Sequence, residues 1–152
     1  GIATVVVPGI TAAAAAVSTL QVSLTRRHRN SSTAFMSAHD AEGFAEHEWQ
    51  QLVRSGQSLA VYMGRKIATF LQGRMLMHGA DRHLPVTCIE NVSLPAQRAF
   101  VSDLGHFAQQ LDAADFDGPL IILVGVAATR AMRSLGAAAA GLQSGGVAVA
   151  SA

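Results

Sequence analysis

The 152-residue sequence has little of several features that mark particular protein classes. It contains a single cysteine, Cys88, which excludes an internal disulfide and fits a reducing compartment such as the cytoplasm. No apolar run reaches the ~18 residues that a membrane helix needs, and no basic residues precede the "TAAAAAV" stretch as they would in a secretory signal. Charged residues make up 14% of the chain and the net charge is +1, so we expect neither nucleic acid nor a membrane as a partner.

Several catalytic and binding motifs are also missing. The sequence has no G-x-G-x-x-G, no P-loop and no G-x-S-x-G nucleophile elbow. Its six histidines form no metal-ligand pattern, because His78 and His83 are separated by Gly79 and do not share a helix face. We therefore expect no metal site.

The residues that are present alternate between strand-like and helix-like segments, which predicts an α/β fold with a mixed sheet flanked by helices. Half of the residues are hydrophobic, enough for a buried core. Strands are predicted at Thr4–Val7, Thr33–Ser37, Ser58–Met63, Pro85–Ile89, Ala99–Val101 and Leu120–Val124. Helices are predicted at Ala12–Leu20 with Thr11 as cap, before Gly56, at Arg65–His78, and after a Ser102 cap with the stripe Leu104, Phe107, Ala108 and Leu111.

Two short motifs at predicted element ends are candidate ligand contacts. "PGITAA", residues 8–13, places Thr11 and small side chains at a helix start, which favours an anion; the simpler interpretation is an ordinary capped junction. "YMG" follows a strand, where α/β sheets commonly bind ligands, and Met63 offers a flexible apolar surface for a planar ring. The alternative is that Tyr62 and Met63 are core residues and Gly64 makes the turn.

Three further features are ambiguous. Glu90-Asn91 lies past a strand end, where Asn91 either binds a ligand or makes a turn. Arg98 either contacts an anion or is solvated. The basic cluster "RRHR", residues 26–29, either meets phosphates or carboxylates or belongs to a solvated linker.

Taken together, the ordered segments resemble one known family. The series "VVPGITAA", "SLTRR", "FMSAH", "EWQQLVRSGQSLAVYMG", "LMHGADRHLPVTCIENVSLPAQR" and "GPLIILVG" is similar to the carboxyl-terminal portion of the uroporphyrinogen-III C-methyltransferases. These are S-adenosylmethionine-dependent tetrapyrrole methylases, also found as the last module of sirohaem synthases. The resemblance spans about Thr4 to Gly125.

The resemblance implies a cofactor, a reaction and a set of contacts. S-adenosylmethionine would lie in a cleft between two α/β domains, and a methyl group would pass to uroporphyrinogen III, giving precorrin-2. The implied cofactor contacts are Thr11, Ala12, Met63 and the backbone near Val92 and Leu120. The family is homodimeric, so we expect a homodimer. Val92 stands where the family usually has glycine, and "LTRRHRNSS" replaces the more usual "LTHRDYAQS".

The motifs of the family's amino-terminal domain, such as "GPGDP" and a catalytic carboxylate, are absent from this sequence. The resemblance therefore divides the chain into a remnant of the first domain (residues 1–22), a linker (23–31), the carboxyl-terminal methylase domain (32–128) and an Ala/Gly-rich tail (129–152), expected to be disordered. We expect no catalytic residue in this chain and no methylation by it alone. Two alternatives remain open: another precorrin methyltransferase of the cobalamin pathway, or a non-catalytic α/β module that binds a ligand.

Overall fold

The computed structural model describes residues 9–28, 30–40, 43–44 and 47–126. The helices are α1 (Ala12–Leu20), α2 (Trp49–Ser55), the 3-10 turn η1 (Arg65–Ile67), α3 (Ala68–Met77) and α4 (Phe107–Ala113). The strands are β1 (Thr33–Ser37), β2 (His39–Asp40), β3 (Gly43–Phe44), β4 (Ser58–Tyr62), β5 (Pro85–Glu90), β6 (Arg98–Asp103) and β7 (Leu120–Val124). The strand predicted at Thr4–Val7 and the predicted tail from residue 129 lie outside the described residues.

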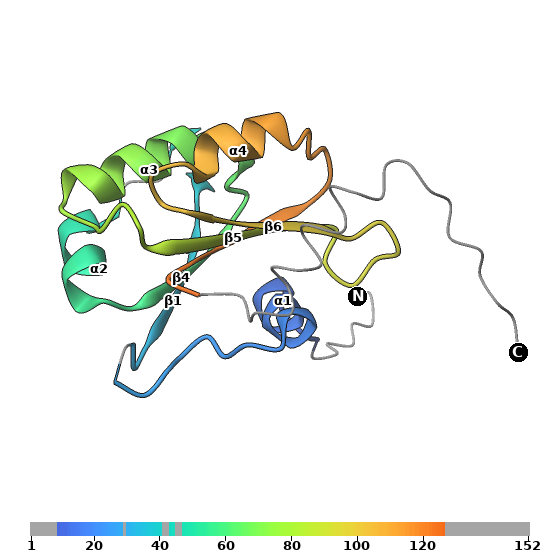
Figure 1. Cartoon of the computed structure of the whole chain (residues 1–152), viewed down its shortest axis with the longest axis horizontal. Coiled ribbons are helices and arrows are strands. Elements are labelled where there is room, and N and C mark those ends of the chain that lie inside the picture. Colours follow the sequence, from blue (N-terminus) through green and yellow to red (C-terminus); the bar gives the residue numbers. More distant parts are fainter. Residues whose placement is uncertain (1–8, 29, 41–42, 45–46, 127–152) are drawn as a thin grey trace, which may run out of the picture.

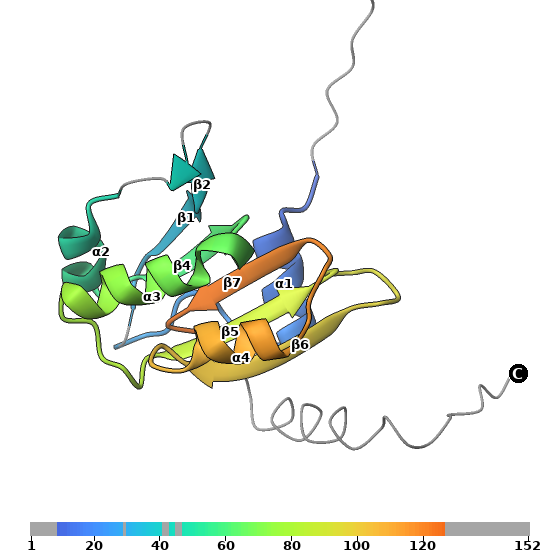
Figure 2. The ribbon, with the colours of Figure 1, turned by 90° about the horizontal axis from the view of Figure 1, so that it is seen from above.

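Five strands form one mixed sheet in the order β1-β4-β7-β5-β6, which confirms the predicted fold class. β1 runs parallel to β4, whereas β7 is antiparallel to both of its neighbours, β4 and β5. β2 and β3 form a separate antiparallel pair. In Figure 1, α3 and α4 cover one face of the sheet and α1 lies on the other; Figure 2 shows the covered face from above, with α2 beside α3.

The two faces of the sheet build two cores, because successive side chains on a strand point to opposite sides. On β4, Leu59 and Val61 belong to the larger core beneath α2, α3 and α4, while Ala60 faces α1. The smaller core joins Ala13, Ala16 and Leu20 of α1 to the opposite face. Ala13 and Ala16 are small side chains that permit close approach of the helix to the sheet, and Leu20 fills the end of the contact.

Local signals account for most of the helix ends. The Thr11 hydroxyl accepts a hydrogen bond from the Ala14 N–H at 3.2 Å, so the predicted cap of α1 is confirmed. α2 ends at Gly56, whose φ of 62° is the left-handed conformation that glycine tolerates best. The segment predicted as one helix from Arg65 begins instead with the 3-10 turn and becomes α-helical at Ala68.

The helix start predicted at Ser102 is wrong, and the strand predicted at Ala99–Val101 is longer than expected. Ser102 does not cap a helix, because β6 continues through it to Asp103 and Ser102 pairs with Val86. α4 begins later, at Phe107, after a turn in which the His106 ring nitrogen lies 2.7 Å from the Asp103 carboxylate. Leu104 is buried as the periodicity suggested, yet it precedes the helix.

A hydrogen-bonded loop joins α1 to β1 within the predicted linker. The Leu24 carbonyl accepts hydrogen bonds from the Asn30 carboxamide and the Ser58 hydroxyl, both at 2.7 Å. Arg26 and Asn30 form an isolated antiparallel bridge. The loop is thus fastened to the start of β4. No helix in the described part of the chain has the length and apolarity to cross a membrane.

Candidate functional site

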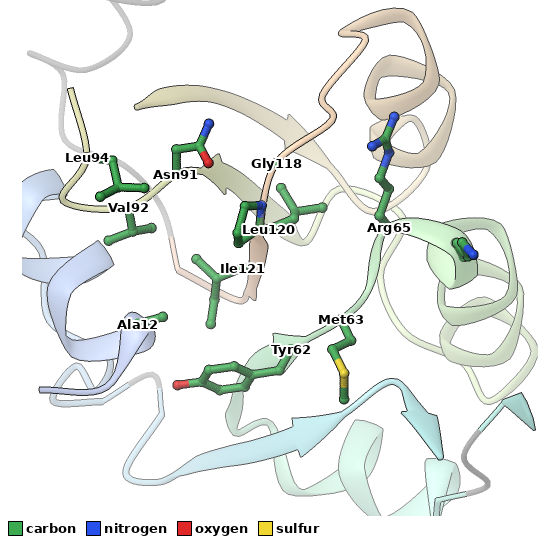
Figure 3. Close-up of a pocket in the computed structure, with 12 residues that line it drawn as sticks. Ala12, Tyr62, Met63, Arg65, Asn91, Val92, Leu94, Gly118, Leu120 and Ile121 are labelled. Atoms are coloured by element: carbon green, nitrogen blue, oxygen red, sulfur yellow. The ribbon is translucent and has the colours of Figure 1, made fainter. Parts of the chain in front are cut away.

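A cavity of about 570 Å³ opens at one end of the sheet. Its lining is mostly apolar and comes from the start of α1, the turn after β4, the loop after β5 and the start of β7 (Figure 3). The strand register explains this convergence. Tyr62 at the end of β4 pairs with Ile121, and Glu90 at the end of β5 pairs with Leu120, so two strand ends meet one strand start.

The structure brings together four of the five residues predicted to contact a cofactor. Ala12, Met63, Val92 and Leu120 all line the cavity, although they come from four separate segments. Thr11 is not among the lining residues, and its hydroxyl is engaged in capping α1. Their contact with a ligand stays a prediction, but their assembly around one cavity is an observed property of the fold.

The start of α1 is held by two oxygens of the chain itself. Thr11 accepts from the Ala14 N–H, and the Tyr62 hydroxyl accepts from the Ala13 N–H at 3.2 Å. Two of the first helix amides therefore already have acceptors, which favours the capped-junction interpretation of "PGITAA" over an anion site. Sequence reasoning missed the Tyr62 contact, because its partner lies 49 positions away.

Met63 is not a core residue. Its side chain is 62% exposed and its φ is 56°, a left-handed conformation that costs a residue other than glycine about 1–2 kcal/mol. Gly64 has an ordinary φ of −80°, but a Cβ there would lie 2.6 Å from Ile122 Cδ1. A Cβ at position 64 would therefore force the Ile122 side chain to shift, which favours glycine there, and the unusual backbone lies at Met63 at the mouth of the cavity.

Glu90 does not line the cavity but holds the segment that forms one of its walls, through hydrogen bonds to the backbone. Its carboxylate is fully buried, and Oε1 accepts hydrogen bonds from the backbone N–H groups of Asp117 and Gly118, both at 2.6 Å. Oε2 accepts from Arg98 Nε at 2.7 Å. Since Gly118 and Leu120 line the cavity, the carboxylate fixes the segment that forms this wall.

The charge of Glu90 is retained despite its burial. Burial by itself raises the pKa of Glu90, but the hydrogen bonds from Arg98, Gly118 and Asp117, with the positive charge of Arg98, outweigh it and lower that pKa overall. Arg98 also lies over the ring of Phe116, 4.8 Å from its centroid. The anion that the sequence suggested for Arg98 is thus a carboxylate of the chain itself.

The loop after β5 adopts left-handed backbone at Asn91 (φ 52°) and Ser93 (φ 66°), and Val92 between them is not among the described positive-φ residues. Valine in place of the family's glycine therefore causes no strain of that kind here. The Asn91 N–H donates to the Pro119 carbonyl at 2.9 Å. Its carboxamide packs so closely on Gly118 that a Cβ there would collide with it, so Asn91 serves as a turn and packing residue.

The basic cluster of the linker and the potential metal ligands add little to the candidate site. The basic residues Arg26, Arg27 and His28 line a polar depression of about 350 Å³ in the linker, away from the larger cavity's lining, and their ligand role stays a prediction. No group of three or more potential metal ligands occurs among the described residues.

Comparison with known proteins gives a consistent picture. The sequence profile of the Tetrapyrrole (Corrin/Porphyrin) Methylases matches residues 1–108. Proteins named siroheme synthase are similar over most of the chain: the one from Saccharophagus degradans is 33% identical over 120 residues, covering 79% of this chain and 26% of its own. That of Neisseria meningitidis serogroup C is 35% identical over 120 residues, covering 79% and 25%. The chain thus spans about a quarter of the length of these relatives.

Solved structures share the fold. A cobalt precorrin-4 methyltransferase has a TM-score of 0.72 at 16% identity, covering 78% of this chain and 50% of its own. A uroporphyrin-III C-methyl transferase from Thermus thermophilus, complexed with S-adenyl homocysteine, has a TM-score of 0.65 at 23% identity, covering 85% and 53%. The chain therefore matches about half of each of these structures.

Proposed function

The chain belongs to the tetrapyrrole methylase family, and from this premise we propose that it serves the S-adenosylmethionine-dependent C-methylation of uroporphyrinogen III to precorrin-2, in sirohaem and cobalamin biosynthesis. One observation carries the proposal: four of the residues expected to contact the cofactor surround one apolar cavity. The similarity to proteins named siroheme synthase, together with the similarity in fold to a uroporphyrin-III C-methyl transferase, supports uroporphyrinogen III as the acceptor.

The residues present fit an adenosyl group. The cavity volume of about 570 Å³ lies within the range of small-molecule sites, and an apolar lining with few polar groups is typical of them. Leu120 and Val92 offer flat apolar surface, and the exposed Met63 thioether suits an aromatic ring. When bound, S-adenosylmethionine supplies an electrophilic methyl group on a sulfonium.

The residues of this chain contribute to the reaction by binding the cofactor and orienting it toward the methyl acceptor. Holding two reactants in line contributes much of the rate of such transfers. Glu90 supports one wall from outside the cavity by fixing the backbone of Gly118, and Tyr62, which itself lines the cavity, fixes the backbone of Ala13. The lining residues include no carboxylate and no histidine, so we expect proton transfer to depend on groups beyond this cavity and the chain alone not to methylate.

Two further candidates each have a specific observation in their favour. The similarity in fold to a cobalt precorrin-4 methyltransferase keeps another ring carbon of a precorrin in consideration as the acceptor. The lack of a carboxylate or a histidine in the cavity lining favours a module that binds an adenosyl ligand without catalysis. Measuring methylation of uroporphyrinogen III and of precorrins by a protein that joins this chain to a family amino-terminal domain separates the three candidates.

We also propose a cytoplasmic setting and a homodimer. The lone cysteine, Cys88, is fully buried, and burial raises the pKa of its thiol, so the residue is unreactive in a reducing compartment. Exposed large apolar side chains, such as Ile10, Phe35 and Leu94, favour self-association. Light scattering that finds a stable monomer at working concentration contradicts the dimer.

The test of cofactor binding is calorimetric titration with S-adenosylhomocysteine. Met63→Ala should weaken binding roughly 2- to 10-fold, because a sulfur–aromatic contact contributes about 0.3–1.5 kcal/mol. Met77→Ala is the matched control, since Met77 is also exposed but does not line the cavity. Equal affinities for both variants and the native chain would refute the proposed site.

A further inference from the structure

Two cationic residues stand at the mouth of the cavity. Arg65 and Lys66 both line it and both are exposed, whereas most of the remaining lining is apolar. In Figure 3 the Arg65 side chain extends away from Met63, so its guanidinium lies at the edge and not against the apolar floor. The cavity thus combines an apolar interior with a cationic rim.

Local stability does not explain this placement. Arg65 and Lys66 are the first residues of the 3-10 turn that leads into α3, and that turn contains no acidic residue. Positive charges at a helix start oppose the helix dipole and weaken the helix slightly. Because these two residues lower the stability of the helix start and lie at the rim of a cavity, binding of a ligand explains their placement better.

Among the residues that the structure describes, acidic groups do not neutralise the pair. No ion pair joins either residue to an acid within the described residues. Glu90 is buried and bonded to Arg98, and Asp117 lies 3.7 Å from the same guanidinium. Two acids of the adjoining wall, Glu90 and Asp117, are thus already paired with Arg98, and the positive charge at the rim remains available.

We propose that Arg65 and Lys66 form a carboxylate-binding rim, which holds a ligand carboxylate while an apolar part of the bound molecules fills the cavity. The inference rests on the proposed function, under which two molecules carry carboxylates: the tetrapyrrole with its acidic side chains, and the cofactor with its amino-acid end. Arginine suits this role because its planar guanidinium matches a carboxylate with two parallel hydrogen bonds.

Three probes distinguish the sources: uroporphyrin III as a stable polycarboxylate, S-adenosylhomocysteine, and methylthioadenosine, which lacks the amino-acid carboxylate. Each is titrated into the full chain and into the double variant R65Q/K66Q. The control variant is R54Q, which removes an exposed arginine of α2 outside the cavity. Thermal unfolding of each variant checks the fold, and R65Q/K66Q should be as stable as the native chain or slightly more so.

Uroporphyrin III affinity should fall about 5- to 30-fold in R65Q/K66Q, since each exposed ion pair contributes a factor of a few. It should be unchanged in R54Q. Added salt should weaken binding to the native chain more than to the double variant. A different result assigns the rim to the cofactor's carboxylate: R65Q/K66Q binds S-adenosylhomocysteine more weakly than the native chain does, but binds uroporphyrin III and methylthioadenosine equally well.

The proposal of a carboxylate-binding rim is refuted if R65Q/K66Q binds uroporphyrin III and S-adenosylhomocysteine as tightly as the native chain does. It is also refuted if the native chain binds neither of these two probes. Binding of methylthioadenosine then decides the proposed function separately. If it binds, the adenosyl site stands without the rim. If uroporphyrin III binds through the rim but no adenosyl ligand binds, the proposal of the rim is supported and the proposal of a cofactor site is refuted.

Discussion

Replacing Glu90 with glutamine should destabilise the fold in a pH-dependent manner. The carboxylate accepts three hydrogen bonds at full burial, two on Oε1 and one on Oε2. Glutamine keeps an oxygen for the Asp117 and Gly118 N–H groups, but its NH₂ group then faces Arg98 Nε, donor against donor. The loss is one hydrogen bond to a charged group, about 1.5–3 kcal/mol. For a chain of this size that corresponds to a fall of roughly 3–12 °C in Tm.

The sign of the pH dependence follows from the lowered pKa of Glu90 in the folded state. A carboxyl group with a lowered pKa stabilises the fold above its unfolded pKa, and that contribution disappears as the pH falls through the folded value. The gap in Tm between the native chain and E90Q should therefore be full at neutral pH. It should narrow below about pH 4, near the ordinary pKa of a glutamate.

The assay is thermal unfolding by circular dichroism at a series of pH values. Glu48→Gln is the control, because Glu48 is exposed at the start of α2 and makes no capping hydrogen bond there. Its Tm should follow that of the native chain. A gap for E90Q that stays constant into the acid range, or equal effects of the two substitutions, would falsify the account of Glu90 as a buried, ionised support.

Three other substitutions test the walls of the cavity. Tyr62→Phe removes the acceptor of the Ala13 N–H and should cost about 0.5–1.5 kcal/mol of unfolding free energy in denaturant titrations; no change would mean that water replaces the hydroxyl. Gly118→Ala forces a Cβ against the Asn91 carboxamide, and chemical denaturation should show a loss of about 1–3 kcal/mol. Met63→Gly relieves the left-handed backbone and should raise Tm while weakening S-adenosylhomocysteine binding; a lower Tm contradicts the strain.

Strands and helices were predictable where local signals were strong. The limits of α1 and its Thr11 cap, the β1 strand and the β7 strand agree with prediction, because short apolar runs between turn residues determine them. The start of α4 was not predictable from periodicity alone. Ser102 is a good cap by residue type, yet its pairing with Val86 in the sheet overrides that preference.

The candidate site was predictable only in part. The assembly of Ala12, Met63, Val92 and Leu120 depends on the sheet order, which local patterns do not determine; it came from family resemblance. The role of Glu90 as a buried support was not predicted, because only Asn91 of the Glu90-Asn91 pair was considered. A usable signal existed: Glu90 and Arg98 flank one loop between two predicted strands, and opposite charges at such positions pair across a hairpin, as they do here.

The turn after β4 shows why backbone conformation at a site is hard to infer. In "YMG", glycine is the expected position for positive φ, but Gly64 has an ordinary φ and lies where β7 approaches, so that a Cβ there would displace the Ile122 side chain. The reversal of the chain therefore falls on Met63, at a cost of about 1–2 kcal/mol. This backbone conformation leaves the large apolar side chain of Met63 exposed to solvent at the cavity mouth. Strain of this kind persists only where the surrounding structure enforces it. The buried strand β4, which leads into the turn and is paired with β7, supplies that enforcement.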